Sequence, residues 1–149
     1  MRSLICLILL TCLPATSWAA LGDHESSVQQ DGVALKAMGR RVLKTNAAFT
    51  THEMTTPTAT VKEYINGDGV VFAASWQGIK APDLSVLMGS YYTDYQTAKR
   101  SMAQRYGHGP VIVKGSRAVV LRHGHMRDLR GLAYVPSLMP PGVRVEDLQ

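Results

Sequence analysis

The sequence predicts an α+β fold in which an antiparallel sheet of about five strands is covered on one face by one main amphipathic helix, with or without a short N-terminal helix. Several segments alternate apolar and polar residues with the period of a strand. Two of them flank the turn sequence 66–69, and a longer segment, 84–102, carries apolar residues at helical spacing. With 149 residues, 46% of them hydrophobic, the chain suits one globular domain and excludes a disordered or polytopic membrane protein.

The first 19 residues have the order of a secretory signal peptide. Arg2 precedes an apolar run over 4–10, and the segment ends with the small residues Ser17 and Ala19. We therefore expect cleavage between Ala19 and Ala20, and export to the periplasm or out of the cell. The run is shorter than the roughly 20 apolar residues that cross a bilayer, so no transmembrane anchor is expected after cleavage.

Both cysteines, Cys6 and Cys12, lie in the segment that we expect to be removed. A mature chain without cysteine has no thiolate nucleophile, no thiolate metal ligand and no disulfide. These three kinds of chemistry are therefore not expected.

The order of elements along the chain follows from local signals. Val28, Val33, Leu35 and Met38 favour a short helix that Gly39 would end.

We divide the chain into the cleaved segment 1–19, an N-terminal segment 20–47 with this short helix, a single α+β domain 48–136 and an irregular C-terminal tail 137–149.

The strands of the domain begin at Ala48, where the apolar period changes to two, and the first ends before Pro57. Residues 61–65 and 70–76 alternate around the Asn66 to Gly69 turn and predict a hairpin. In a regular strand Trp76 shares the face of Phe72. Further short strands are expected at 111–113, 118–121 and 129–135.

The main helix is predicted to begin after Asp83, whose carboxylate can cap its first turn. Its apolar stripe runs from Leu84 through Tyr91 and Tyr95 to Met102. Gly89 in mid-helix costs about 1 kcal/mol relative to Ala, so we expect close packing of the helix on the sheet there.

A set of residues spread over nearly the whole mature chain forms a recognisable pattern: 62–65, 69–78, Pro82, Asp83, Leu84, Gly89, Tyr91, 124–127, Gly131, Ala133, Pro136, Leu138, Pro140 and Gly142. This pattern resembles a proteobacterial family of small exported proteins that is catalogued as domain of unknown function 2844. The resemblance implies export and a shared architecture, and it implies no catalytic role.

A metal site is the first candidate chemistry. His123 and His125 flank Gly124, and on a strand both imidazoles project from one face, as a zinc or copper chelate requires, with His108 as a third ligand. Arg122 and Arg127 beside them would repel a divalent cation. We therefore expect no cofactor and keep zinc or copper as the alternative.

A basic face is the second candidate. The formal net charge is +5, and the segment 99–130 holds eight Lys and Arg residues against one acid, Asp128. Such a face suits phosphate or carboxylate groups of an anionic envelope polymer, a lipid headgroup or another exported protein. Nucleic acid is not expected, because export removes the usual target. The candidate ligand-binding residues are Tyr92, Arg122, His125 and Arg127.

Together these patterns favour an exported, non-catalytic binding or interaction module over an enzyme. No catalytic residue is assigned, because the Gly-x-Ser-x-Gly elbow and the zincin pattern after His52 are both missing. The alternative is a small metal-dependent or general acid/base enzyme that uses His123 and His125, with His52 as a further candidate. A purely structural assembly factor is the third hypothesis.

Overall fold

The computed structural model describes residues 20–44, 47–102 and 109–148. The strands in these residues are β1 (Gly39–Lys44), β2 (Phe49–Thr55), β3 (Ala59–Asn66), β4 (Val71–Gly78), β5 (Val111–Lys114), β6 (Val119–His125) and β7 (Asp128–Tyr134). They form one antiparallel sheet in the order β1-β2-β3-β4-β7-β6-β5. Strands β4 and β7, which are distant in the sequence, therefore lie side by side at its centre.

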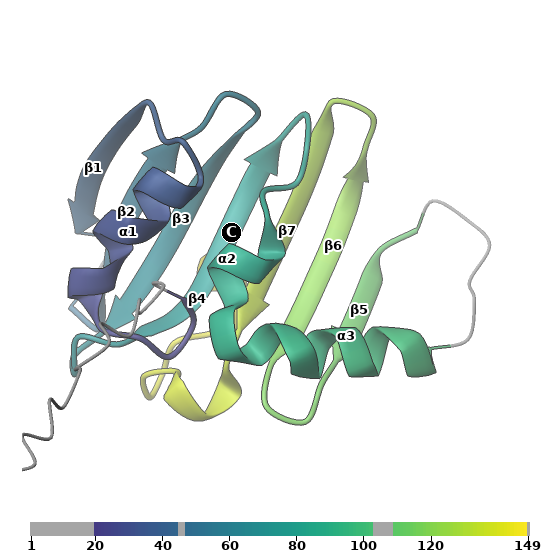
Figure 1. Ribbon diagram of the computed structural model, residues 1–149. Coiled ribbons are helices and arrows are strands. Elements are labelled where there is room, and N and C mark those ends of the chain that lie inside the picture. Colours follow the sequence, from purple (N-terminus) through teal and green to yellow (C-terminus); the bar gives the residue numbers. More distant parts are fainter. Residues whose placement is uncertain (1–19, 45–46, 103–108, 149) are drawn as a thin grey trace, which may run out of the picture.

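The three α-helices and the 3-10 helices next to them in the sequence lie on one face of this sheet (Figure 1). Within the described residues, none is long and apolar enough to cross a membrane. They are the 3-10 helix η1 (Glu25–Ser27), α1 (Val28–Ala34), α2 (Leu84–Met88), the 3-10 helix η2 (Gly89–Tyr91) and α3 (Tyr92–Ser101).

The expected sheet of about five strands is wrong, because the sheet has seven strands and strands dominate the fold over helices. Gly39 begins β1 instead of ending a helix, and it pairs with Thr55 of β2. The preceding helix ends at Ala34, and Lys36 then takes a φ of 54°. Val42 in the middle of β1 is 60% exposed, so this edge strand lacks the buried apolar positions that revealed the other strands.

The main helix is also interrupted. Gly89 has a φ of 46°, and at this residue α2 ends and η2 begins, followed by α3. A Cβ at Gly89 would collide with the Cβ of Ala20, so the close packing expected at this glycine is made with the N-terminal segment. The apolar stripe therefore bends as it crosses the sheet.

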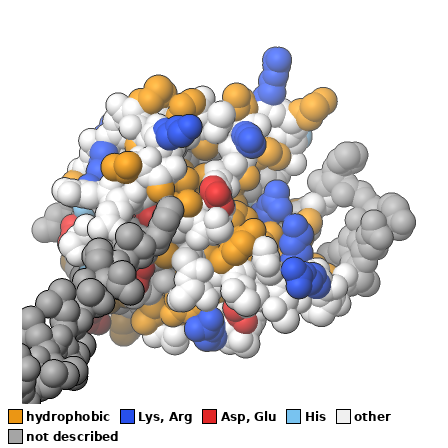
Figure 2. Space-filling view, viewed as in Figure 1, with side chains coloured by type: hydrophobic (Ala, Val, Ile, Leu, Met, Phe, Trp, Pro, Cys, Tyr) orange, Lys and Arg blue, Asp and Glu red, His pale blue; other side chains and the backbone are white. Residues whose placement is uncertain are grey.

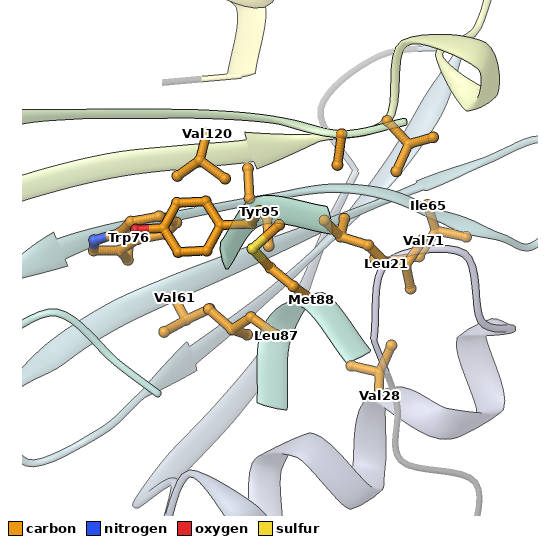
Figure 3. Close-up of a cluster of buried hydrophobic side chains, with 14 of the residues drawn as sticks. Leu21, Val28, Val61, Ile65, Val71, Trp76, Leu87, Met88, Tyr95 and Val120 are labelled. Carbon is orange, nitrogen blue, oxygen red and sulfur yellow. The ribbon is translucent and has the colours of Figure 1, made fainter. Parts of the chain in front are cut away.

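The larger core fills the space between the helices and the sheet (Figure 3). Leu87 and Met88 of α2 and Tyr95 of α3 are at most 4% exposed, and they meet Val61 and Trp76 of the sheet. Burying an aliphatic side chain of this size stabilises a fold by about 1.5–3 kcal/mol. This core holds the helices on one face of the sheet and leaves the opposite face for the second core.

A second, smaller core lies on the other face of the sheet. Phe49, Tyr64 and Phe72 pack edge-to-face or tilted, with ring centroids 5.6–6.3 Å apart. The C-terminal residues cover them through Leu138, Met139, Val143, Val145 and Leu148, which come from the 3-10 helices η3 (Pro136–Leu138) and η4 (Val145–Leu148) and the loop between them. The tail thus covers one half of this face.

A bulge in β4 corrects the expectation that Trp76 and Phe72 share a face. Tyr64 pairs with Ala73, whereas the next residue, Ile65, pairs with Val71, so Phe72 is an extra residue in β4. Phe72 consequently belongs to the core under the tail, and Trp76 belongs to the core under the helices.

Candidate functional site

The half of the second face that the tail leaves open contains a hollow of about 100 Å³. Two neighbouring rows of side chains, each running across β3, β4, β7 and β6, form its lining, because paired residues on adjacent strands project to the same face. The first row is Lys62, Ser75, Leu132 and Leu121, and the second is Thr60, Gln77, Arg130 and His123. The backbone around Trp76 and Gly131 completes the lining.

The polar groups of the hollow are cations and neutral donors. Lys62 is half-buried and forms no ion pair within the part of the chain that the structure describes. His123 and Arg130 lie exposed at the rim. Among the described lining residues there is no carboxylate, so the hollow itself favours an anion.

Arg130 is held in place by an acidic neighbour outside the hollow. Its guanidinium donates to the carboxylate of Asp128 at 3.0 Å, and the Gln77 amide donates to the same carboxylate at 2.8 Å. The hydrogen bonds from Arg130 and then from Gln77 hold the pKa of Asp128 below its usual range. Arg130 is therefore oriented, and part of its charge is neutralised.

The inner lining is apolar. Leu132 is 1% exposed and lies at the floor, and Leu121 is half-buried beside it. On the opposite, helix-covered face, the indole of Trp76 packs so closely against Gly131 that a Cβ at that position would collide with it, so these two residues meet the hollow through their backbone alone. A ligand in the hollow thus meets donors at its rim and hydrocarbon at its floor.

The four sequence-predicted ligand residues do not lie around this hollow. Tyr92 belongs to α3 on the helix-covered face, where its ring centroid lies 6.0 Å from that of Tyr95. Arg122 alternates with His123 and so projects to the helix-covered face. His125 and Arg127 are exposed at the β6–β7 turn, which Figure 1 shows at the end of the sheet opposite α3.

The predicted basic face is likewise divided. On the helix-covered face, Figure 2 shows the Lys and Arg side chains of the described residues spread between hydrophobic and uncharged ones. The cations that meet in the hollow, Lys62 and Arg130, come from strands far apart in the sequence. Charge counting along 99–130 included Arg130 among eight basic residues without selecting it as a ligand residue, and it missed Lys62, which lies outside that segment.

The predicted metal ligands lie partly outside the described residues, because His108 falls in 103–108. His123 pairs with Arg130 and His125 with Asp128, so the two histidines occupy alternate positions of β6. In 20–44, 47–102 and 109–148, no group of three or more His, Cys, Asp or Glu side chains is placed to hold a metal ion. Of the predicted cleavage pair, Ala19 lies outside the described residues and Ala20 is buried.

A buried acidic pair lies on the helix-covered face. Asp31 of α1 and Glu63 of β3 are each 1% exposed. Burial, together with the hydrogen bond and charge of Glu63, raises the pKa of Asp31 to about 10, and burial raises the pKa of Glu63 to about 7. Both carboxyl oxygens of Asp31 and one of Glu63 have no hydrogen-bond partner among the described residues. A proton shared by the pair would let one neutral carboxyl donate to the other and so satisfy two of these three oxygens. This pair was not identified from the sequence. The signal that could have indicated it is Glu63 itself, which lies between the apolar residues Val61 and Ile65 on the same side of its alternating strand.

His52 lies beside this pair, opposite Glu63 in the β2–β3 register. One ring nitrogen is 2.6 Å from the Arg40 guanidinium and the other 2.8 Å from the Glu25 carboxylate. Burial and the charge of Arg40 lower the pKa of His52. Because Asp31, His52 and Glu63 are at most 2% exposed, a substrate does not reach them. The cluster joins η1 and α1 to the strands β1, β2 and β3 of the sheet.

One protein-family model matches residues 17–148 of this chain, and its description is Protein of unknown function (DUF2844). No curated protein and no solved structure is significantly similar to the chain. The match covers nearly the whole chain and includes both the hollow and the buried acidic pair.

Proposed function

Because the chain belongs to this DUF2844 family, whose function is unknown, we propose a function from its own geometry: it is an exported, non-catalytic binding protein whose open sheet face receives an anionic group of an envelope component. The single observation that carries the proposal is the hollow, where Lys62, His123 and Arg130 converge over an apolar floor. A carboxylate or phosphate group suits these donors.

Lys62 contributes most to this argument. Arg41 and Arg130 on the same face are already paired, with Glu53 at 2.7 Å and with Asp128 at 3.0 Å. Lys62 forms no ion pair among the described residues, and the carboxylate of Glu53, its cross-strand neighbour in β2, is bound by Arg41. An ammonium group that is half-buried and unpaired gains more from an arriving anion than an exposed, paired guanidinium does.

Export is supported by the apolar segment before Ala20 and by the start of the family match at residue 17. Ala20 packs against Gly89, and the backbone N–H of Leu21 donates to Leu87 at 3.1 Å. Cleavage after Ala19 leaves both contacts in the mature chain. Expression of the full chain in a bacterium that has an outer membrane, followed by intact mass measurement of the periplasmic fraction, tests this. We expect a chain beginning at Ala20, and a full-length cytoplasmic product would contradict export.

Anion binding is tested by two-dimensional amide NMR of the mature chain during titration with inorganic phosphate at constant ionic strength. We expect saturable shifts at Lys62, Gln77 and Arg130 and their loss in Lys62→Ala. Lys80→Ala, which removes an exposed lysine outside the hollow, is the matched control and should titrate like the wild type. Shifts confined to other surfaces, or no saturable shifts, would refute the proposal.

A further inference from the structure

We propose that the ligand of the hollow is a single-chain amphiphilic anion, an acid group carried on a linear alkyl chain. This inference rests on the proposed function and names the ligand class. It follows from how polar and apolar side chains are arranged along one row of the sheet.

The first row of the hollow continues beyond it on both sides, to Ile112 of β5 at one end and to the paired Glu53 of β2 and Arg41 of β1 at the other. Ile112 of β5 pairs with Leu121, and Leu121 pairs with Leu132, so three strands in succession present an aliphatic side chain on this face. Neighbouring strands are about 4.8 Å apart, so these side chains form an apolar strip about 10 Å long. Ile112 at its outer end is 46% exposed.

The other half of the same row is polar. Leu132 pairs with Ser75, and Ser75 pairs with Lys62. The unpaired ammonium therefore lies two strands from the apolar strip, with Thr60 and Gln77 in the neighbouring row. A ligand lying across the strands would place its acid group at Lys62 and its alkyl chain over Leu121 and Ile112.

The tail limits the ligand to this direction. The Tyr64 hydroxyl lies 3.0 Å from the Ser75 hydroxyl and donates to the backbone oxygen of Leu148 at 2.8 Å, so the covered half of the face begins directly beside the row. A slim molecule fits along the row, whereas a broad one meets the tail.

A charged polymer or a bilayer surface is a poorer match. Such partners bind through many free cations on an exposed surface, and the exposed guanidinium groups of Arg41 and Arg130 are already paired with carboxylates. Leu121 and Ile112, the two accessible side chains of the strip, would also gain nothing from a hydrophilic polymer. The arrangement thus favours one amphiphilic molecule at a time.

The test compares octyl phosphate, below its micelle concentration, with inorganic phosphate by calorimetry and amide NMR of the mature chain. We expect octyl phosphate to bind at least about tenfold more tightly, because the alkyl chain adds apolar burial. Lys62→Ala should weaken both ligands. Ile112→Ser should weaken octyl phosphate several-fold and leave phosphate unchanged, whereas Val111→Ser, on the opposite face of β5, is the matched control.

The outcomes separate the two proposals. If phosphate binds at Lys62 as tightly as octyl phosphate, or if Ile112→Ser has no effect, the amphiphile is refuted and anion binding stands. If neither compound binds at the hollow, both proposals fail. Vesicles of phosphatidylglycerol and phosphatidylcholine provide the third arm, because sedimentation with these vesicles without binding of octyl phosphate would also overturn the inference and point to a bilayer surface.

Discussion

The carboxylate of Asp94 on α3 accepts a hydrogen bond of 2.6 Å from the hydroxyl of Ser116, in the turn between β5 and β6. The backbone N–H groups of Ser116, Arg117 and Ala118 also donate to this carboxylate, at 3.0–3.3 Å. Arg117 in turn lies over the ring of Tyr91, 4.7 Å from its centroid. One acidic side chain thus fixes the helix layer to the far edge of the sheet.

Replacing this carboxylate should loosen that edge. We expect Asp94→Ala to lower the free energy of unfolding by about 2 kcal/mol at pH 7, because several charge-assisted hydrogen bonds are lost. Urea unfolding followed by circular dichroism measures the change. Asp68→Asn in the exposed β3–β4 turn is the control and should change stability by less than about 0.5 kcal/mol. Equal stability of both variants would show that the turn does not depend on Asp94.

The same contact predicts an acid-dependent loss of stability. Hydrogen bonds, first of all from the Ser116 side chain, lower the pKa of Asp94 to about 2. A carboxyl group with a lowered folded-state pKa stabilises the fold above its unfolded pKa, and this stabilisation is lost as the pH falls from about 4 to about 2. Unfolding curves at pH 7, 4 and 2.5 should therefore show the wild type and Asp94→Asn converging at the lowest pH. A constant difference between them would contradict the assignment.

The buried pair Asp31 and Glu63 predicts the opposite dependence. With the pKa of Asp31 raised to about 10, the folded state holds a proton that the unfolded state releases above about pH 4. Stability from this pair is therefore complete below that pH and falls as the pH rises, by about 1.4 kcal/mol per pH unit for one proton. We expect Asp31→Asn to flatten this decline. Its free energy of unfolding relative to that of the wild type, measured by urea unfolding, should therefore rise between pH 5 and pH 9.

Two further variants sharpen the test of the acidic pair. Glu63→Gln removes the charge and hydrogen bond that help to raise the pKa of Asp31, so it should also reduce the pH dependence. Glu146→Gln changes an exposed carboxylate in η4 and should leave the decline unchanged. The shared-proton arrangement would be refuted if the wild type kept a constant stability from pH 5 to pH 9.

These features show where sequence reasoning succeeds and where it stops. Alternation located β2, β3 and β4 because their apolar residues face a core on one side. It did not locate β1, whose Val42 is exposed, and it misplaced Phe72, because the extra residue of a bulge leaves no mark in the pattern. The alternation of apolar and polar residues reveals a strand only where one side of that strand is buried and its pairing is regular. An exposed edge strand lacks the first condition, and a bulge breaks the second.

The hollow was only partly predictable for a related reason. His123 was named from its spacing only as a candidate metal ligand, and Lys62, Gln77 and Arg130 meet it only because β4 pairs with β7. Gln77 and Asp128, which share a hydrogen bond, are 51 positions apart in the sequence. The order of strands in the sheet decides which side chains become neighbours, and local patterns in a single sequence do not show which strands pair.

The C-terminal tail supplies the last prediction. Leu148 is fully buried against the aromatic cluster under the tail, and its backbone oxygen accepts a hydrogen bond of 2.8 Å from the Tyr64 hydroxyl. Burial raises the pKa of Tyr64, so the hydroxyl stays protonated and able to donate. We expect Leu148→Ala to cost about 2–4 kcal/mol in urea unfolding, because it leaves a cavity in this core.

Tyr64→Phe removes only the hydroxyl, and it should cost about 1–2 kcal/mol because the carbonyl of Leu148 and the hydroxyl of Ser75 lose a buried partner. Both variants should also increase the fluorescence of a dye that binds exposed apolar surface, since a loosened tail uncovers Phe49 and Phe72. Met126→Ala, at a side chain that is 92% exposed in the β6–β7 turn, is the control and should change neither quantity. If Leu148→Ala had the same free energy of unfolding as the wild type, the tail would not help to stabilise the sheet. The tail would then also not limit the space beside the hollow.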